Sequence, residues 1–208
     1  MRPPPAVILA GGAARRMGGG DKGRLSLGQG TILSSVIARL EPQAGPLALN
    51  ANDDPARFAD LGLPVLPDPV TERPGPLAGV LAAMRWAEGM GADVVVTAAA
   101  DTPFLPADLV PRLLLAAESA PIALAATPDP ERGRVRHPVF GLWPARLADA
   151  LEAALAEGVR KVVVFADAHG VADALFPDED AFFNVNTPED LARAREMASR
   201  EPARGRMA

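Results

Sequence analysis

The stretch LAGGAARRMGGGDKGR, residues 9–24, combines backbone freedom with positive charge directly after a short apolar run. It contains six glycines, three arginines and one lysine. Gly11 and Gly12 carry no Cβ, so backbone N–H groups at these positions can approach a ligand closely. The consecutive glycines at 18–20 provide a second turn whose amides can form an anion-binding concavity. The stretch therefore favours binding of a phosphate group over a simple connection between two elements.

Two cations of this stretch, Arg16 and Lys22, can make charge-assisted hydrogen bonds to phosphate oxygens. A P-loop would need Gly-Lys-Ser/Thr, but Asp21 precedes Lys22 and Gly23 follows it, and the G-x-G-x-x-G spacing is missing as well. The chain has one other lysine, at 161, whereas arginine is its usual cation. A compact ammonium at position 22 thus indicates a binding role. The alternative is a surface loop with solvated charges.

Strands and helices alternate along the sequence, as apolar runs and apolar positions at helical spacing indicate. The expected strands cover residues 6–10, 46–50, 64–66, 93–98, 122–126, 139–142 and 171–175. The expected helices cover residues 31–40, with Thr31 as N-cap, and 55–61, 77–88, 106–119, 146–156, 159–168 and 188–199. This order predicts an α/β fold with a mostly parallel sheet that helices cover on both faces.

Ligands of such sheets bind beyond the carboxyl ends of the strands. The glycine-rich stretch follows the first expected strand, Asn50-Ala51-Asn52 ends the second, and Asp101-Thr102-Pro103 follows the buried run Val94-Val95-Val96. We therefore expect these polar groups to share one edge of the sheet.

Composition limits the classes of function. The 208 residues are enough for one domain, expected over residues 1–200, with a disordered tail at 201–208. A net charge of −5 argues against nucleic-acid binding by bulk electrostatics, so an anion site must be local. We expect no membrane span and no secretory signal, because the apolar runs are too short. The chain has no cysteine, which excludes a thiolate metal site and fits a cytoplasmic location.

Nine short blocks follow one another in a characteristic order. They are LAGG at 9–12, RRMGG at 15–19, DK at 21–22, NAN at 50–52, Asp68, GPLAG at 75–79, DTP at 101–103, HP at 137–138 and NVNTPE at 184–189. In this order they resemble the molybdenum cofactor guanylyltransferases, the MobA family. The resemblance implies the nucleotide-diphospho-sugar transferase fold, a Rossmann-like three-layer α/β/α sandwich. It also implies transfer of GMP from GTP to molybdenum-bound molybdopterin, with release of pyrophosphate.

The resemblance further implies roles for individual residues. On the nucleotide side it implies that backbone groups of Leu9, Ala10, Gly11 and Gly12 contact the guanine and the phosphates. It implies that Arg16 and Lys22 bind the triphosphate. It also implies that Asn50 and Asp68 contact the guanine nucleotide. On the metal and acceptor side it implies a magnesium ligand in Asp101, and pterin or near-metal positions for Asn184 and Asn186, with His137 beside them. Arg16, Lys22 and Asp101 form the expected catalytic set.

Nucleotidyl transfer brings two polyanions together, and its nucleophile is already a phosphate anion, so catalysis is expected to be positioning and electrostatics. Asp101 suits Mg²⁺, which takes one or two carboxylates with water and phosphate oxygens. Its alternative role is to cap the helix expected at 106–119. Asp68 lies between Pro67 and Pro69 and would select guanine by accepting from N1–H and the 2-amino group, with ordinary turn polarity as the alternative.

Several motifs have structural interpretations. Thr187 is expected to cap the last helix, and Asp190 stands where a capping box has Glu or Gln, which leaves Asn184 and Asn186 as functional candidates. The GPLAG block at 75–79 fits close ligand approach and helix–sheet packing about equally. The basic segment 132–136 is interpreted as a solvated hairpin tip rather than a flap over an anionic substrate. His169 receives no role.

Other functions stay open from the sequence. They are a cytidylyltransferase for the same pterin, a sugar-phosphate nucleotidyltransferase, and a non-catalytic GTP-binding carrier of the cofactor. Gly11 and Gly12 together leave room for a purine, and the set Arg16, Lys22 and Asp101 argues for turnover. Ala14 and the GQGT run at 28–31 depart from the family pattern and bear on substrate positioning. Expected partners are GTP, molybdenum-molybdopterin, molybdopterin-handling proteins and molybdoenzyme chaperones, with no nucleic acid and no membrane.

Overall fold

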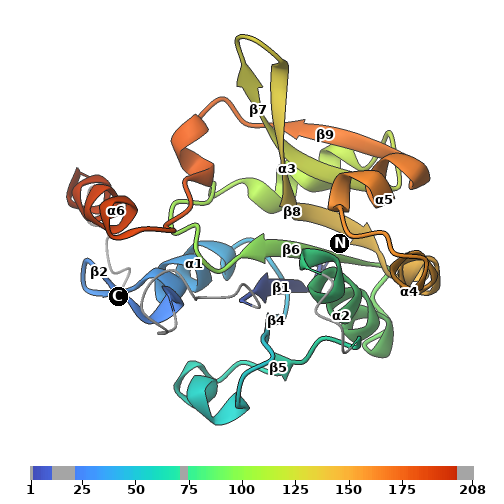
Figure 1. Cartoon of the computed structure of the whole chain (residues 1–208), viewed down its shortest axis with the longest axis horizontal. Coiled ribbons are helices and arrows are strands. Elements are labelled where there is room, and N and C mark those ends of the chain that lie inside the picture. Colours follow the sequence, from blue (N-terminus) through green and yellow to red (C-terminus); the bar gives the residue numbers. More distant parts are fainter. Residues whose placement is uncertain (1, 11–21, 71–74, 201–208) are drawn as a thin grey trace.

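A computed structural model of the chain describes residues 2–10, 22–70 and 75–200. Its main feature is a seven-stranded sheet in the order β5-β4-β1-β6-β8-β7-β9 (Figure 1). The strands are β1 (Ala6–Leu9), β4 (Leu47–Asn50), β5 (Val65–Leu66), β6 (Val94–Ala99), β7 (Ile122–Asp129), β8 (Gly133–Pro144) and β9 (Val171–Leu175). The helices are α1 (Ile32–Leu40), α2 (Pro76–Gly89), α3 (Leu109–Ala116), α4 (Ala148–Ala156), α5 (Val162–His169) and α6 (Pro188–Arg200). Predicted residues Gly11, Gly12 and Arg16, and the tail 201–208, lie outside the described residues.

The sheet is mostly parallel, as expected. The strands β5, β4, β1 and β6 run in one direction, β8 is antiparallel to both β6 and β7, and β9 is parallel to β7. In the centre of the sheet, Leu9 is in register with Asn50 on one side and with Ala99 on the other. The carboxyl ends of β4, β1 and β6 therefore lie side by side.

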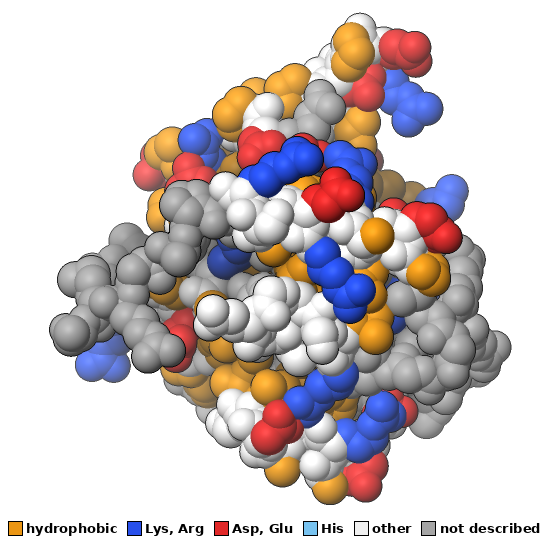
Figure 2. All heavy atoms as spheres, turned by 90° about the vertical axis from the view of Figure 1, so that its left-hand side faces the viewer, with side chains coloured by type: hydrophobic (Ala, Val, Ile, Leu, Met, Phe, Trp, Pro, Cys, Tyr) orange, Lys and Arg blue, Asp and Glu red, His pale blue; other side chains and the backbone are white. Residues whose placement is uncertain are grey.

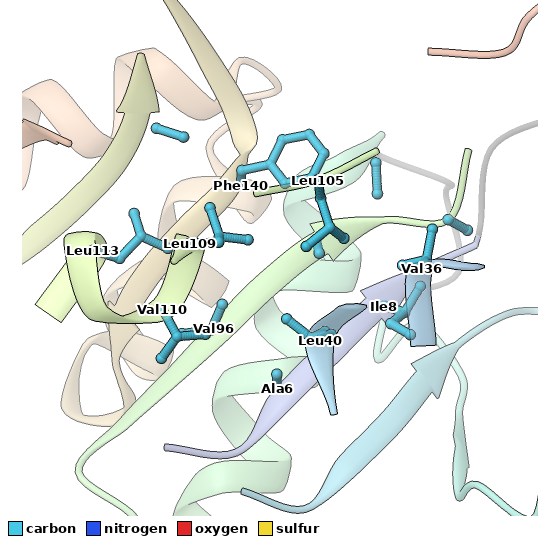
Figure 3. Packing of buried hydrophobic residues seen from close by; sticks show 14 of the residues in the cluster. Ala6, Ile8, Val36, Leu40, Val96, Leu105, Leu109, Val110, Leu113 and Phe140 are labelled. Atoms are coloured by element: carbon cyan, nitrogen blue, oxygen red, sulfur yellow. The ribbon is translucent and has the colours of Figure 1, made fainter. Parts of the chain in front are cut away.

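Helices cover both faces of the sheet, which gives the predicted three layers. Strand residues alternate between the faces, as in β1, where Val7 and Ile8 belong to different buried clusters. Helices α1 and α3 pack on the Ile8 face, where Figure 3 shows Leu40 beside β1 and Leu109 near β6. Helices α2, α4 and α5 pack on the Val7 face.

A smaller buried cluster joins the two ends of the chain. It consists of Leu27, Ile32, Phe104, Val185, Leu191 and Ala194. Leu27 belongs to a short hairpin, β2 (Ser26–Leu27) with β3 (Gly30–Thr31), which the sequence analysis did not predict. Leu191 and Ala194 belong to α6, which contacts β2. This packing brings the segment before α6 next to the residues that follow the glycine-rich stretch.

The helix expected at 106–119 is shorter in the structure and begins at Leu109. The residues before it are held by Gln43, whose side chain donates to Pro106 O at 2.9 Å and accepts from Val110 N at 2.9 Å. A side chain from the turn after α1 thus satisfies the first turn of α3, and the local pattern of prolines does not indicate this contact. The N-cap predicted at Thr31 is confirmed, with Ser34 closing a capping box.

Strand β8 is also longer than expected, because its outer half pairs with β7 in a hairpin that projects from the body at the top of Figure 1. Residues 132–134 are exposed at its tip, as the hairpin-tip interpretation predicted, whereas Val135 and Arg136 are half-buried within the strand, so the interpretation is wrong for that part of the segment. Arg134 and Arg136 pair with Asp173 of β9 at 2.6 Å each, so these cations support the hairpin. Within the described ranges, no helix combines the length and apolar character needed to cross a membrane.

Candidate functional site

Polar side chains gather at the carboxyl ends of β4, β1 and β6, in two groups on either side of β1. The Asp68 group consists of Asn50, Asn52 and Asp68, and the Asp101 group of Lys22, Asp101, Thr102, Asn184 and Asn186. Since neighbouring strands are about 4.8 Å apart, roughly 10 Å of sheet separates the ends of β4 and β6. The glycine-rich stretch leaves β1 between the two groups.

In the Asp101 group, the segment 184–186 lies along the residues that follow β6. The Asp101 carbonyl accepts from Val185 N at 2.9 Å, and the fully buried Thr102 bonds through its hydroxyl to Asn184 Oδ1. Val185 is buried, whereas Asn184 and Asn186 are exposed on either side of it. The structure therefore brings both predicted asparagines to Asp101, from which they are distant in sequence.

Lys22 completes this group from the N-terminal part of the chain. Its Nζ donates to Asn186 Oδ1 at 2.8 Å, and because an ammonium can only donate, the amide oxygen must face it. Lys22 lies in a short 3₁₀ helix, η2 (Lys22–Arg24), whose Arg24 makes a bidentate pair with Asp60 at 2.5 and 2.6 Å. The end of the glycine-rich stretch is thus fixed at two points. The role of Arg24 could not be predicted from the sequence, because its partner is 36 residues away and no local pattern marks it.

The Asp101 carboxyl is half-buried beside a cation. Burial raises its pKa above the ordinary value, whereas the Lys22 ammonium and the Thr102 hydroxyl act in the opposite direction. No group of three or more His, Asp or Glu residues that could hold a metal occurs in the described ranges. A single carboxylate in this setting fits a hard cation that takes its other ligands from water and phosphate.

Asp101 is not a helix cap, so that alternative is wrong. Helix α3 begins at Leu109, and its N-cap is Asp108, whose side chain pairs with Arg112 at 2.5 Å. By contrast, the cap predicted for α6 is confirmed: Asp190 N donates to Thr187 Oγ1 at 3.1 Å, and Asp190 Oδ2 accepts from Thr187 N at 2.9 Å. Asp190 thus replaces the Glu of a capping box.

In the Asp68 group, two amides hold one carboxylate. Asn50, only 2% exposed, donates from Nδ2 to Asp68 Oδ1 at 2.9 Å and to Leu66 O at 3.0 Å. Asn52 donates to Asp68 Oδ2 at 2.6 Å and accepts from Asp68 N at 2.8 Å. Asp68 is therefore an organised acceptor and more than a solvated turn residue.

The GPLAG block supports this group by its small size. Gly75 is the N-cap of α2 with a φ of 78°, which favours glycine. A Cβ on Gly79 would overlap Asn50 Oδ1 and lie 3.1 Å from Leu9 Cδ2. Gly79 thus allows α2 to pack against the ends of β1 and β4, as the packing interpretation predicted.

Leu9 is the last residue of β1 and Ala10 follows it, between the two groups. Leu9 O accepts from Ala100 N at 3.2 Å, and Ala10 N donates to Asn50 O at 2.8 Å. The Ala10 N–H is thus used within the sheet, so a ligand contact by Ala10 must come from its other atoms, whereas Leu9 O has one of its two acceptor positions occupied.

His137 lies on the hairpin and packs against the segment that leads to Asn184. Its ring stacks on Phe182 with centroids 4.2 Å apart, and its Nε2 is 3.0 Å from Thr127 Oγ1. Burial lowers the pKa of His137, which favours the neutral ring. A direct contact of His137 with substrate stays a prediction, whereas its packing supports the Asp101 group.

His169, which received no role, lies outside both groups. Its Nδ1 is 2.9 Å from Phe165 O in its own helix.

Figure 2 faces the side of the molecule on which α6 lies and toward which β1 and β6 point in Figure 1. On the described surface, Lys and Arg side chains alternate with Asp and Glu rather than forming one basic field. Among the described residues, positive charge for an anionic ligand must therefore come from individual side chains such as Lys22.

A mostly parallel α/β sheet with a lysine and a carboxylate at its carboxyl edge, and a glycine-rich sequence after its first strand, is typical of a nucleotidyltransferase. Residues 6–171 match the family model described as MobA-like NTP transferase domain. The chain belongs to this family. A protein of Cereibacter sphaeroides named molybdenum cofactor guanylyltransferase is 55% identical over 185 residues, which cover 88% of this chain and 91% of that protein.

Solved structures agree with the fold. Molybdopterin-guanine dinucleotide biosynthesis protein A from Archaeoglobus fulgidus superposes with a TM-score of 0.71 at 25% identity, covering 95% of this chain and all of that one. The 2-C-methyl-D-erythritol 4-phosphate cytidylyltransferase from Thermus thermophilus gives a TM-score of 0.69 at 21% identity, covering 93% and 98% of the two chains, and shares the fold. The predicted nucleotide-diphospho-sugar transferase fold is therefore confirmed.

Proposed function

We propose that this chain transfers GMP from GTP to molybdenum-bound molybdopterin and releases pyrophosphate. The observation that carries the proposal is the Asp101 group, in which Lys22 and Asp101 meet at the edge where the glycine-rich stretch leaves β1. The name of the curated relatives, molybdenum cofactor guanylyltransferase, supports the choice of nucleotide and acceptor. We also propose that residues 1–200 form one nucleotidyltransferase domain.

In this proposal the two groups divide the nucleotide between them. Lys22, together with Arg16, holds the triphosphate, and Asn186 keeps one of the three Lys22 donors occupied so that the others face the phosphates. Asp68 accepts from the guanine base, with Asn50 behind it. Leu9 to Gly12 run along the nucleotide between these groups. Because the acceptor phosphate is already an anion, holding both reactants in line supplies most of the rate.

Asp101 is proposed to hold Mg²⁺. When bound, the ion neutralises charge on the transferring phosphate and the leaving pyrophosphate. The chain itself contributes a carboxylate whose backbone is fixed by Val185 and whose neighbour Thr102 is fully buried. Asn184 and Asn186, exposed beside it, face the side proposed for the pterin. Molybdopterin-handling proteins and molybdoenzyme chaperones are the partners proposed to bring and remove the pterin.

The test is release of pyrophosphate from GTP, CTP and UTP in the presence of molybdenum-molybdopterin, with and without Mg²⁺. We expect release of pyrophosphate from GTP and none from CTP or UTP. We also expect no release from GTP after the metal is chelated. Preference for CTP would indicate a cytidylyltransferase, and turnover only with a sugar phosphate as acceptor would indicate a sugar nucleotidyltransferase. GTP binding without release under any of these conditions would indicate a carrier.

A further inference from the structure

We propose that Asn52 is a specificity-determining residue, which orients the Asp68 carboxylate so that it accepts two parallel donors from one base. The inference rests on the proposed function, in which Asp68 contacts guanine. Asn52 acts through Asp68, so it is a positioning residue. The chemical group it selects is a purine edge with an N1–H and a 2-amino group next to each other.

The contact between Asn52 and Asp68 is reciprocal. Asn52 Nδ2 donates to Asp68 Oδ2 at 2.6 Å, and Asp68 N donates to Asn52 Oδ1 at 2.8 Å. A backbone N–H can only donate, so the amide oxygen must face it and the amide nitrogen must face the carboxylate. The two bonds close a ring that opposes rotation of the carboxylate. Pro67 and Pro69 further restrict the backbone on both sides of Asp68.

Asn50 completes the arrangement from the core. Its Nδ2 is shared between Asp68 Oδ1 and Leu66 O, and its Oδ1 is so close to Gly79 that an added Cβ there would overlap it. Each oxygen of the Asp68 carboxylate therefore receives one amide donor from the described residues. A carboxylate oxygen has two acceptor positions, which leaves a second position on each oxygen for a ligand.

Two neighbouring acceptors on one carboxylate match the edge of guanine. Guanine offers N1–H and the 2-amino group side by side, whereas hypoxanthine has the N1–H and lacks the amino group. Without Asn52, the carboxylate can turn about the remaining bond to Asn50 and meet a single donor equally well. Loss of Asn52 should thus remove the preference for the second donor while leaving the Asp101 group intact.

The experiment is calorimetric measurement of Kd for GTP and for ITP, which differ only in the 2-amino group, with Mg²⁺ and no acceptor. We expect the wild type to bind GTP at least ~10-fold more tightly, since one hydrogen bond to a charged group distinguishes the two. Asn52→Ala should reduce this ratio to within about threefold, mainly by weakening GTP. Asn52→Asp, which places a like charge against Asp68, should reduce it similarly.

The matched control is Asp53→Ala, in the next residue, whose exposed carboxylate pairs with Arg57 at 3.3 Å. This variant should keep the wild-type ratio. If Asn52→Ala weakens GTP and ITP by the same factor, or leaves their ratio unchanged, Asn52 only holds two loops together and the inference is wrong. Failure of the proposed guanine contact can be distinguished from this outcome. In that case the wild type binds GTP and ITP with equal affinity, and Asp68→Asn does not change the ratio of the two Kd values.

Discussion

The Asp101 group and the Asp68 group share one edge of the sheet but are assembled in different ways. Contacts in the Asp101 group join residues far apart in sequence, 164 positions for Lys22 and Asn186 and 82 for Thr102 and Asn184. In the Asp68 group the contacts span 16 and 18 positions, within the β4–β5 unit. The first group contains the charges that transfer chemistry needs, and the second is an amide network around one acceptor.

This difference teaches which part of the site depends on the whole fold. The Asp101 group exists only while α6 packs against the β2–β3 hairpin, because Lys22 and Asn186 belong to these two ends of the chain. The Asp68 group depends on close packing of α2 against β4, through Gly79. Substitutions in the Asp101 group should therefore affect catalysis and nucleotide affinity. Substitutions in the Asp68 group should affect the selectivity for the base.

The largest expected effect separates chemistry from recognition. Asp101→Asn should lower kcat by roughly 10³-fold or more, because the proposed metal ligand is lost where charge develops. The ratio of GTP to ITP affinity should stay as in the wild type, since Asp68 is untouched. Pyrophosphate release and calorimetry measure the two. Asp108→Asn, at the start of α3 and outside both groups, is the control and should keep its rate. A kcat for Asp101→Asn within about threefold of wild type would contradict the proposed role.

The next effect tests the packing beneath the Asp68 group. Gly79→Ala should lower the free energy of unfolding by about 1–3 kcal/mol, because the added Cβ overlaps Asn50 Oδ1. It should also weaken GTP binding through displacement of Asn50. Gly89→Ala, in the same helix with no atom near the added Cβ, should be neutral or slightly stabilising. Chemical denaturation of both variants measures the difference, and equal stabilities would show that α2 has room to move.

A smaller effect concerns the link between the two chain ends. Asn186→Ala should raise the Kd for GTP about three- to tenfold, because Lys22 loses the acceptor that holds its ammonium. The GTP-to-ITP ratio should again be unchanged. An altered ratio would mean that the two groups are coupled across β1, and an unchanged Kd would mean that Lys22 is held by other contacts.

The smallest effect is a dependence of stability on pH. Burial lowers the pKa of His137 in the folded protein, whereas its pKa in the unfolded chain is about 6.5. Between these two values the unfolded state therefore binds the proton more readily than the folded state does. This contribution to stability is complete above the unfolded value and is lost as the pH falls toward the lower folded value. His137→Gln should lose less stability than wild type between neutral and mildly acidic pH, as thermal unfolding at several pH values can measure. Equal pH profiles would contradict a lowered pKa of the buried His137.

Much of the fold could be predicted from the sequence, because strands β1, β4 and β6 are marked by local apolar runs with polar residues after them. Asn50 and Asp101 were placed at the correct edge for this reason. The start of α3 could not be predicted, since its first turn is satisfied by Gln43 from the turn after α1. The outer half of β8 was missed because its pairing with β7 stabilises a polar segment that has no strand-like pattern.

Within the site, the predicted residues were chosen by type and position, and their partners could not be seen. Thr102 was quoted only as part of the DTP block, yet it is fully buried against Asn184. Asn52 belonged to a quoted motif without an assigned task, because its partner Asp68 lies beyond the next strand. Such contacts depend on how strands pair, which no local pattern specifies.

The most direct test of the account is a crystal structure of the chain with GTP and Mg²⁺. The account predicts the triphosphate against residues 9–24 with Lys22 on its oxygens, the metal on Asp101, and the guanine edge on Asp68 across β1. Nucleotide bound away from this edge, or a metal that Asp101 does not touch, would contradict it.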